Sequence, residues 1–216
     1  AVVASAEEDI EEIIQRVEAA AEDDSSPVAA EVPETDTAPQ PPTAGEVEII
    51  PLTGVKKAMA DNMLKSKQTS AHGTTFNEAD LTYAMQLAKA SEKRISVTAI
   101  IVKATVDALK AFPLLNSSST DKEIQIKKYF NISMAVNTDK GLYVPVIKKA
   151  DEKNPEEINA EMKRLGELAE NGILTSEDMA DGTFTISNAG RFGSLFFVPI
   201  INQPESAILG VGTIQK

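Results

Sequence analysis

The sequence predicts a domain of the α/β class, built as a two-layer α+β sandwich in which a mixed sheet carries helices on one face. Helical and strand patterns follow one another between residues 49 and 216 without the strict βαβ repeat of a parallel sheet. A strongly marked helix after Asn154 separates two groups of strand patterns. Hydrophobic residues make up 42% of the chain and charged residues 25%, so a packed core is expected.

The first 48 residues differ from the rest in charge and composition. They contain 14 acids and one base, whereas residues 49–216 contain 19 acids and 20 bases. Residues 1–22 place isoleucines and a valine at helical spacing, which predicts an acidic helical segment, either solvated or docked on a partner. Residues 23–48 combine five prolines with acids and no aromatic residue, which predicts a flexible linker. The folded domain is therefore expected over residues 49–216.

Four helices are predicted from apolar spacing and capping residues. The strongest signal is a capping box in which Asn154 precedes Pro155 and Glu157, and this helix should run to Asn171 and end before Gly172. The other helices are expected over Thr53–Lys67, over Leu81–Lys93 and from Ser96 to Pro113. The residues that should share one face of the first are Val55, Met59 and Met63. The residues of the helix after Ser96 that should face the core are Val97, Ile100, Ile101, Ala104, Ala108 and Phe112.

Six strands are predicted from short runs rich in β-branched and aromatic residues. They are expected at Ala71–Asp80, Ile124–Ile126, Tyr129–Asn137, Leu142–Ile147, Thr183–Ser187 and Ala207–Val211. Thr74 and Phe76 should lie on one side of the first strand. Since helices interrupt the strands irregularly, the sheet should be mixed.

Composition excludes several classes of site. The chain has no cysteine, which excludes disulfides, thiolate metal sites and cysteine nucleophiles. Its single histidine, His72, excludes a metal site made of several histidines. No run of about 18 apolar residues occurs, so no membrane-spanning helix is predicted. A nearly neutral domain behind an acidic extension argues against binding to nucleic-acid phosphates.

Eight short strings, spread from residue 54 to residue 210, resemble one protein family in the same order. They are GVKKAMADNM (54–63), AHGT (71–74), KA to FPLLN (103–116), NISMAV (131–136), GLYVPVI (141–147), GTFTISN (182–188), PIINQP (199–204) and AILG (207–210). Each string alone is a weak match, but together they resemble the acyltransferase core subunits of 2-oxo acid dehydrogenase complexes. The resemblance covers roughly residues 48–216.

The resemblance implies a chloramphenicol-acetyltransferase-like fold and a homotrimer, often built further into a hollow cage. It implies transfer of an acyl group from the dihydrolipoyl arm of a lipoyl domain to coenzyme A, without a metal. The implied partners are 2-oxo acid dehydrogenase and dihydrolipoamide dehydrogenase subunits, in the cytoplasm or in a mitochondrial or plastid matrix. A lipoyl group is attached to lysine and no lysine precedes Lys56, so the lipoyl domain is expected outside this chain. Residues 1–22 are similar, over a short stretch, to the closing edge of such a domain.

The resemblance also assigns candidate site residues. In this family a Ser or Thr hydroxyl, just before the Asn of the FTISN string, stabilises the oxyanion of the tetrahedral intermediate. Here that residue is Ser187, which without the resemblance would be taken for an ordinary strand serine. Asn188, Gly190 and Gly193 surround it, and they are expected either to shape the substrate channel or simply to turn the chain.

The family's general base is a histidine in a His-x-x-x-Asp-Gly motif, which these 216 residues do not contain. We therefore expect the sequence to be a piece of a longer acyltransferase, without the base and without the last strand and helix. Lys56 stands where the family has an arginine that pairs with the Asp of that motif. It is a candidate ion-pair partner, or else a solvent-facing lysine, since an ammonium cannot reproduce a guanidinium fork. His72 is expected to be structural rather than to replace the base.

Two functions remain open at this point. The first is an acyltransferase core that moves an acetyl, succinyl or branched acyl group to coenzyme A. The alternative is a non-catalytic scaffold member of such a complex, which keeps the fold and lacks the catalytic histidine. The coding sequence beyond Lys216 distinguishes them, because a His-x-x-x-Asp-Gly motif supports the enzyme and a stop codon supports the scaffold.

Overall fold

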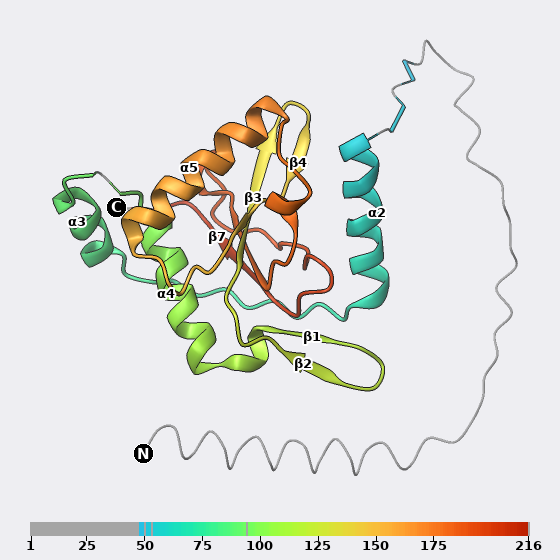
Figure 1. Cartoon of the computed structure of the whole chain (residues 1–216), viewed down its shortest axis with the longest axis horizontal. Helices are drawn as coiled ribbons and strands as arrows, with labels where there is room; N and C mark the ends of the chain where they lie inside the picture. Colours follow the sequence, from blue (N-terminus) through green and yellow to red (C-terminus); the bar gives the residue numbers. More distant parts are fainter. Residues whose placement is uncertain (1–47, 50, 53, 94, 216) are drawn as a thin grey trace, which may run out of the picture. The chain divides into compact units, whose positions relative to one another are not determined.

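The structure is a computed structural model, and it describes residues 48–49, 51–52, 54–93 and 95–215 (Figure 1). The acidic helical segment expected at residues 1–22, nearly all of the linker expected at 23–48, and the capping residue Thr53 lie outside the described residues. The unit described below is the one formed by Ile50–Lys216.

A mixed sheet forms the centre of this unit. Its strands are β3 (Ile132–Thr138), β4 (Gly141–Tyr143), β5 (Val146–Ile147), β6 (Phe184–Asn188) and β7 (Ile208–Val211). β4 and β5 pair antiparallel with β3, whereas β6 lies parallel to β3 and β7 lies parallel to β6. The predicted α/β class with a mixed sheet is confirmed.

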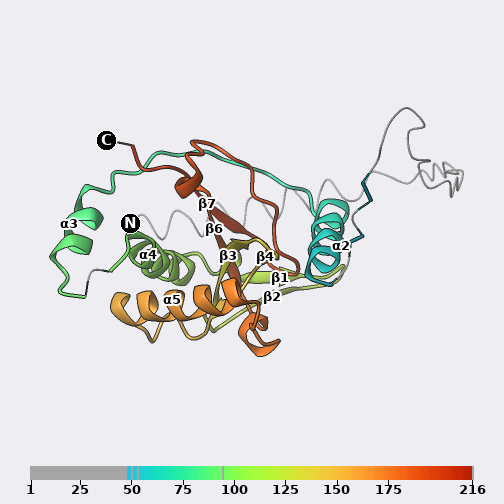
Figure 2. The ribbon, with the colours of Figure 1, turned by 90° about the horizontal axis from the view of Figure 1, so that it is seen from above.

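The α-helices of the described residues lie beside and below this sheet. They are α2 (Gly54–Thr69), α3 (Thr82–Ala90), α4 (Val97–Ala111) and α5 (Pro155–Asn171). α4 and α5 lie together along one face of the sheet, and α2 packs beside β4 (Figure 2). Short 3-10 helices occur at Pro113–Leu115, Glu177–Met179 and Gly190–Phe192. The expected placement of helices on one face holds for α4 and α5, while the segment between α2 and α3 crosses the other face (Figure 2).

The hydrophobic core lies between the sheet and helices α4 and α5. Alternate residues of β3 and β6 point into it, and these are Ile132, Met134, Phe184 and Ile186. The helix residues that complete the core are Val102, Val106, Leu109, Ile158 and Leu165. Because side chains alternate along a strand, Ser133, Thr185 and Ser187 face the opposite side of the sheet.

The predicted inward face of α4 is wrong. The buried residues of this helix are Ala99, Val102, Thr105, Val106 and Leu109, and none of the six residues expected inside is among them. Phe112, expected to face the core, is 62% exposed. The helix is apolar on more than one side, so the 3.6-residue period admits two faces and the sequence does not choose between them. Its start is as predicted, because the Ser96 side chain accepts a hydrogen bond from the Ala99 N–H at 3.1 Å.

The strand predicted at Ala71–Asp80 is also wrong. This segment is extended and mostly exposed, but it joins no sheet. Its Phe76 ring packs edge-to-face on Phe196, with the ring centroids 5.6 Å apart, and this contact replaces the expected strand pairing.

Two strand predictions change in detail. The strand expected at Leu142–Ile147 is divided into β4 and β5, which pair with β3 in one continuous register. The division falls next to Pro145, which has no N–H to donate to a ladder. The hairpin strand β2 (Ile124–Ile126) is as predicted, but its partner β1 (Ser117–Ser119) was not foreseen, since three serines carry no strand pattern.

Helix α5 follows its sequence signals at both ends. The Asn154 Oδ1 accepts from the Glu157 N–H at 2.9 Å, and a Glu157 carboxylate oxygen accepts from the Asn154 N–H at 2.8 Å. Gly172 ends the helix in the left-handed conformation, with φ of 70°. These local signals determine where the helix begins and ends without help from distant residues.

Asn154→Ala is expected to lower the free energy of unfolding by about 1 kcal/mol, because the first turn of α5 loses a capping acceptor. Chemical denaturation of the two proteins measures the difference. Asn154→Asp serves as the control, since a carboxylate keeps the acceptor and should retain the stability. Equal destabilisation by both variants would contradict the capping argument.

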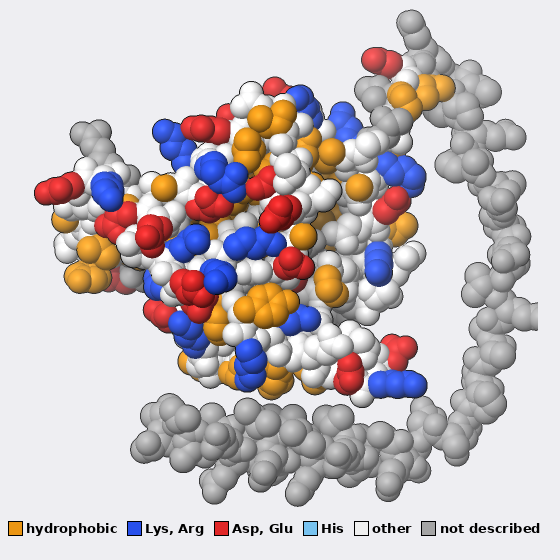
Figure 3. Space-filling model, viewed as in Figure 1, with side chains coloured by type: hydrophobic (Ala, Val, Ile, Leu, Met, Phe, Trp, Pro, Cys, Tyr) orange, Lys and Arg blue, Asp and Glu red, His pale blue; other side chains and the backbone are white. Residues whose placement is uncertain are grey.

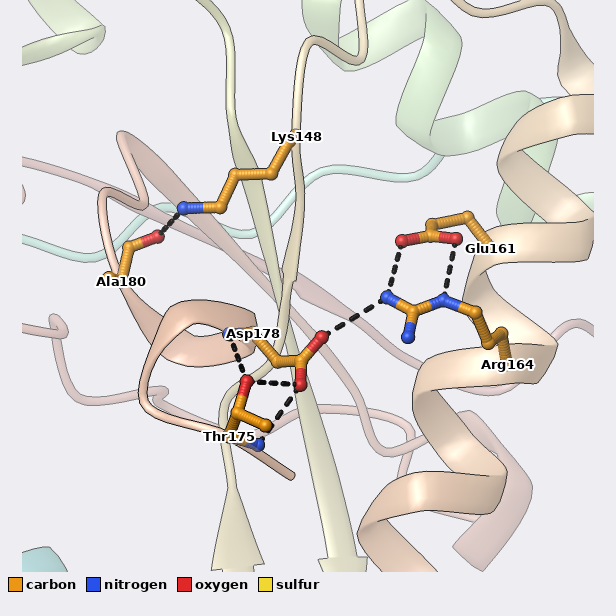
Figure 4. A network of polar contacts seen from close by, with 6 residues as sticks. All are labelled: Lys148, Glu161, Arg164, Thr175, Asp178 and Ala180. Atoms are coloured by element: carbon orange, nitrogen blue, oxygen red, sulfur yellow. Dashed lines mark hydrogen bonds and ion pairs between the residues drawn. The ribbon is translucent and has the colours of Figure 1, made fainter. Parts of the chain in front are cut away.

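A polar network joins α5 to the turn that leads into β6 (Figure 4). Arg164 donates to both carboxylate oxygens of Glu161, at 2.8 and 2.9 Å, and to Asp178 at 3.2 Å. Asp178 in turn accepts from the Thr175 hydroxyl at 2.6 Å, and Lys148 donates to the Ala180 carbonyl. A single exposed ion pair contributes little to the stability of a protein. The main effect of the network is therefore to fix where the chain turns before the strand that contains Ser187.

Acidic and basic side chains are interspersed over the face viewed in Figure 3. This mixture agrees with the 19 acids and 20 bases of residues 49–216. Within the described part of the chain, every helix is too short or too polar to cross a membrane.

Candidate functional site

Ser187 lies in β6, the middle one of three parallel strands. Its partners in register are Ala135 of β3 and Gly210 of β7. The side chain is half-buried and shares with Thr185 the side of the sheet that faces away from the core. Both neighbours in register are small residues, and over Gly210 the sheet is covered by Phe197 and Pro199, which a Cβ at this glycine would meet at 3.0 and 3.4 Å.

The turn after Ser187 is held by its own side chains. The Asn188 Nδ2 donates to Thr98 Oγ1 of α4 at 3.2 Å, and its Oδ1 accepts from the Gly190 N–H at 3.0 Å. Gly193 takes the left-handed conformation, with φ of 80°. The amide of Asn188 is thus engaged within the protein, which favours the interpretation that these residues turn the chain.

Gly190 permits a close approach of two backbone segments. A Cβ at this position would lie 2.4 Å from the Gly212 carbonyl oxygen. The Gly190 carbonyl also accepts from Thr213 Oγ1 at 2.6 Å, which ties the turn to the residues after β7.

Gly190→Ala is expected to lower the free energy of unfolding by about 1–3 kcal/mol, because the new methyl group must displace backbone rather than a flexible side chain. Thermal and chemical denaturation measure this loss. Gly166→Ala, in helix α5 with open space around its Cβ position, is the matched control and should be neutral or stabilising. Similar losses in both variants would refute the close-approach argument.

His72 is structural, as expected from the resemblance. Its Nε2 accepts from the Ile201 N–H at 3.2 Å, and a backbone N–H can only donate, so Nε2 carries no proton. Its Nδ1 lies 2.9 Å from the Ser70 carbonyl oxygen and therefore donates to it. With both ring nitrogens engaged, His72 ties the segment after α2 to residue 201 and does not serve as a base.

Lys56 lies exposed in the first part of α2, on the far side of β3 from Ser187. A Cβ at Gly141 of β4 would lie 3.7 Å from the Lys56 Cγ, so the lysine stem passes this strand. Gly141 pairs with Thr138, three residues along β3 from the partner of Ser187. The structure therefore does not bring Lys56 and Ser187 into one contact.

A cavity of about 500 Å³ lies next to β7. His72 and Phe76, from the segment between α2 and α3, line it together with Phe196 and Gly210. Ser187 does not itself line this cavity, but its partner in register, Gly210, does. The lining of the cavity combines aromatic side chains with polar groups and backbone.

A buried carboxyl group lies on the same side of the sheet. Glu205 is 5% exposed; its Oε2 accepts from Thr185 Oγ1 at 2.6 Å, and its Oε1 accepts from Ser133 Oγ at 3.2 Å and Asn202 Nδ2 at 3.3 Å. Asn202 Oδ1 accepts from Asn62 Nδ2 of α2 at 2.9 Å. Burial raises the pKa of Glu205 to about 7, and the three hydrogen bonds oppose this rise only in part.

Glu205 is not among the candidate residues expected from the sequence. A carboxylate just before the apolar AILG string is a signal, because an acid so close to a buried strand needs partners. Its partners Ser133 and Thr185 are 72 and 20 residues away, however, and no local pattern reveals them.

The chain matches the family described as 2-oxoacid dehydrogenases acyltransferase (catalytic domain) over residues 44–216. It is 39% identical over 175 residues to the dihydrolipoyllysine-residue succinyltransferase component of the 2-oxoglutarate dehydrogenase complex of Haemophilus influenzae. That match covers 77% of this chain and 43% of the relative. The chain thus spans less than half the length of this curated relative.

Two solved structures are similar in fold. The dihydrolipoamide acetyltransferase of Azotobacter vinelandii gives a TM-score of 0.77 at 34% identity, covering 82% of this chain and 78% of that chain. Crystallographic and enzymatic work on that protein addressed the role of a serine, a histidine and an asparagine in its catalytic mechanism. The cubic core of the pyruvate dehydrogenase multienzyme complex gives a TM-score of 0.74 at 35% identity, with coverages of 82% and 78%. The chloramphenicol-acetyltransferase-like fold that the resemblance implies is confirmed.

Proposed function

The chain belongs to the 2-oxoacid dehydrogenase acyltransferase family, and on that basis we propose that it supplies the acyl-transfer site of a core subunit in a 2-oxo acid dehydrogenase complex. The reaction moves an acyl group from a dihydrolipoyl thioester to the thiol of coenzyme A. The observation that supports this proposal most directly is the position of Ser187. It lies in the central parallel strand and in register with Gly210, which lines the cavity.

The proposed reaction is a thioester exchange through a tetrahedral intermediate. The coenzyme A sulfur attacks the acyl carbonyl carbon, the carbonyl oxygen takes the negative charge, and the bond to the dihydrolipoyl sulfur then breaks. The proton released by coenzyme A is returned to the dihydrolipoyl sulfur. The Ser187 hydroxyl donates a hydrogen bond to the oxyanion, where charge develops in the transition state.

The attacking thiol also needs a base. His72 does not supply it, because the Ile201 N–H occupies its Nε2 and its Nδ1 donates to Ser70. The resemblance assigns this role to the histidine of the His-x-x-x-Asp-Gly motif, and Lys56 remains the candidate partner of the Asp in that motif. A positioned base contributes typically about 100- to 10,000-fold to such a reaction.

The acyl group and the assembly are part of the same proposal. The curated relatives include a succinyltransferase component at 39% identity, an acetyltransferase component at 44% and a branched-chain lipoamide acyltransferase component at 41%, so identity does not select the acyl group. Similarity to a cubic core supports assembly into a homotrimer and a larger cage. The lipoyl domain, the 2-oxo acid dehydrogenase and dihydrolipoamide dehydrogenase are the proposed partners, with the lipoyl group and coenzyme A entering as substrates.

The test is an acyl-transfer assay on the full-length protein as its gene encodes it. S-acetyl-, S-succinyl- and S-isobutyryl-dihydrolipoamide are offered separately with coenzyme A, and the formation of each acyl-coenzyme A is followed. We expect turnover with at least one donor and none when chloramphenicol replaces coenzyme A. An assembled protein that transfers no acyl group from any of the three would overturn the proposal and support the scaffold alternative.

A further inference from the structure

One buried side chain joins two strands of the proposed site and lies three residues before the third. Glu205 lies just before β7, and its carboxyl group binds Ser133 of β3 and Thr185 of β6. Ser133 and Thr185 are partners in register, so the carboxyl bridges one rung of the parallel pair. The next rung on the same side of the sheet holds Ser187, about 7 Å further along β6.

The surrounding chain is shaped around this carboxyl. A Cβ at Gly182 would lie 2.1 Å from the Ser133 Oγ and 3.1 Å from the Glu205 Oε1, so only glycine leaves room for the pair. Asn202 donates to the carboxyl and also lies 3.4 Å from the Thr185 hydroxyl. The site is therefore built for a side chain of this shape and acceptor pattern, rather than for an apolar filler.

The same network reaches helix α2. Asn62 donates to Asn202, and the buried Ser66 hydroxyl donates to the Ile201 carbonyl at 2.6 Å. The segment before β7 is thereby fixed to α2 on one side and to β3 and β6 on the other. Where β7 begins decides which of its residues faces Ser187, and the observed register places Gly210 there.

We propose that Glu205 is a positioning residue of the acyl-transfer site, which holds β3, β6 and β7 in the register that presents the Ser187 hydroxyl to the substrate. This inference rests on the proposed function of Ser187 and goes beyond it. Glu205 does not touch the reacting atoms. It acts through the hydroxyls of Ser133 and Thr185, whose buried O–H groups would have no acceptor without it.

The mechanism of this effect is geometric. An oxyanion donor works only where its hydroxyl meets the developing charge, and a displacement of about 1 Å costs on the order of 100-fold in rate. Glu205→Gln keeps the side-chain volume and one acceptor oxygen. Its amide N–H group, however, faces a partner that donates a hydrogen bond in the parent and cannot accept this N–H without rearranging. We therefore expect Glu205→Gln to lower kcat about tenfold and Glu205→Ala to lower it more. The KM values for the acyl donor and for coenzyme A should stay within about twofold, since substrate binding is not changed.

A double-mutant cycle on the full-length protein tests the inference. kcat is measured for the parent, Glu205→Gln, Ser187→Ala and the double variant, with Glu177→Gln on an exposed turn as the matched control for loss of one carboxylate. If Glu205 acts through Ser187, Glu205→Gln lowers kcat about tenfold in the parent and less than about twofold in the Ser187→Ala background. The Glu177→Gln control should keep parental kcat.

The possible results separate the two proposals. If Glu205→Gln lowers kcat by the same factor in both backgrounds, Glu205 does not act through Ser187. That result would overturn the positioning role of Glu205 and leave the proposed role of Ser187 unaffected. An unchanged kcat in Glu205→Gln would overturn it as well. If Ser187→Ala alone leaves kcat unchanged, the proposed role of Ser187 fails, and the role of Glu205 that rests on it fails too.

Discussion

Ser187→Ala is expected to lower kcat for acyl transfer about 100- to 1000-fold, which corresponds to a loss of about 2.7–4 kcal/mol of transition-state stabilisation. The hydroxyl lies on the side of the sheet away from the core, in register with the glycine of the cavity wall. Its removal takes away a donor to the oxyanion and leaves the core side of β6 intact. The fall should therefore appear in kcat, with KM for both substrates changed little.

Two further variants serve as controls for this measurement. Ser187→Thr keeps a hydroxyl at the same position and should retain more of the activity than the alanine variant. Ser119→Ala removes an exposed serine from β1 and should keep parental kcat. A Ser187→Ala enzyme with the turnover of the parent would remove this serine from the mechanism, whatever the stability of the protein.

The sequence predicts best those elements whose signals are local. Helix α5 begins and ends as expected, because Asn154, Glu157 and Gly172 fix their own turns through neighbours a few residues away. Strand β2 and the start of α4 at Ser96 are predictable for the same reason. The family resemblance adds Ser187, which no periodicity distinguishes from an ordinary strand serine.

The errors arise where distant residues decide the outcome. The segment with Phe76 has a strand pattern, but it packs on Phe196 and joins no sheet, and only tertiary contacts settle that choice. The buried side of α4 is set by where the sheet lies, since more than one side of the helix is apolar. Glu205 is the clearest case, because its partners come from β3, β6 and residue 202 and meet only in the folded chain.

The buried carboxyl also makes stability depend on pH. Its pKa rises from 4.5 to about 7 on burial, so between these values the folded protein binds the proton that the unfolded chain has released. The free energy of unfolding must therefore fall as pH rises from about 4.5 to about 7, and the contribution of Glu205 to it is constant above that range. A shift of this size corresponds to a loss of about 3 kcal/mol.

Glu205→Gln should remove this dependence, because an amide does not titrate. Between pH 4.5 and pH 7 the parent is therefore expected to lose about 3 kcal/mol of unfolding free energy relative to Glu205→Gln. This change is expected whatever the difference between the two proteins is at any single pH. Chemical denaturation of both proteins at intervals from about pH 4 to pH 8 measures the difference, and other titrating groups cancel in it. A flat difference for Glu205→Gln would mean that the folded carboxyl titrates at its ordinary value. The hydrogen bonds from Ser133, Thr185 and Asn202 would then fully offset the cost of its burial.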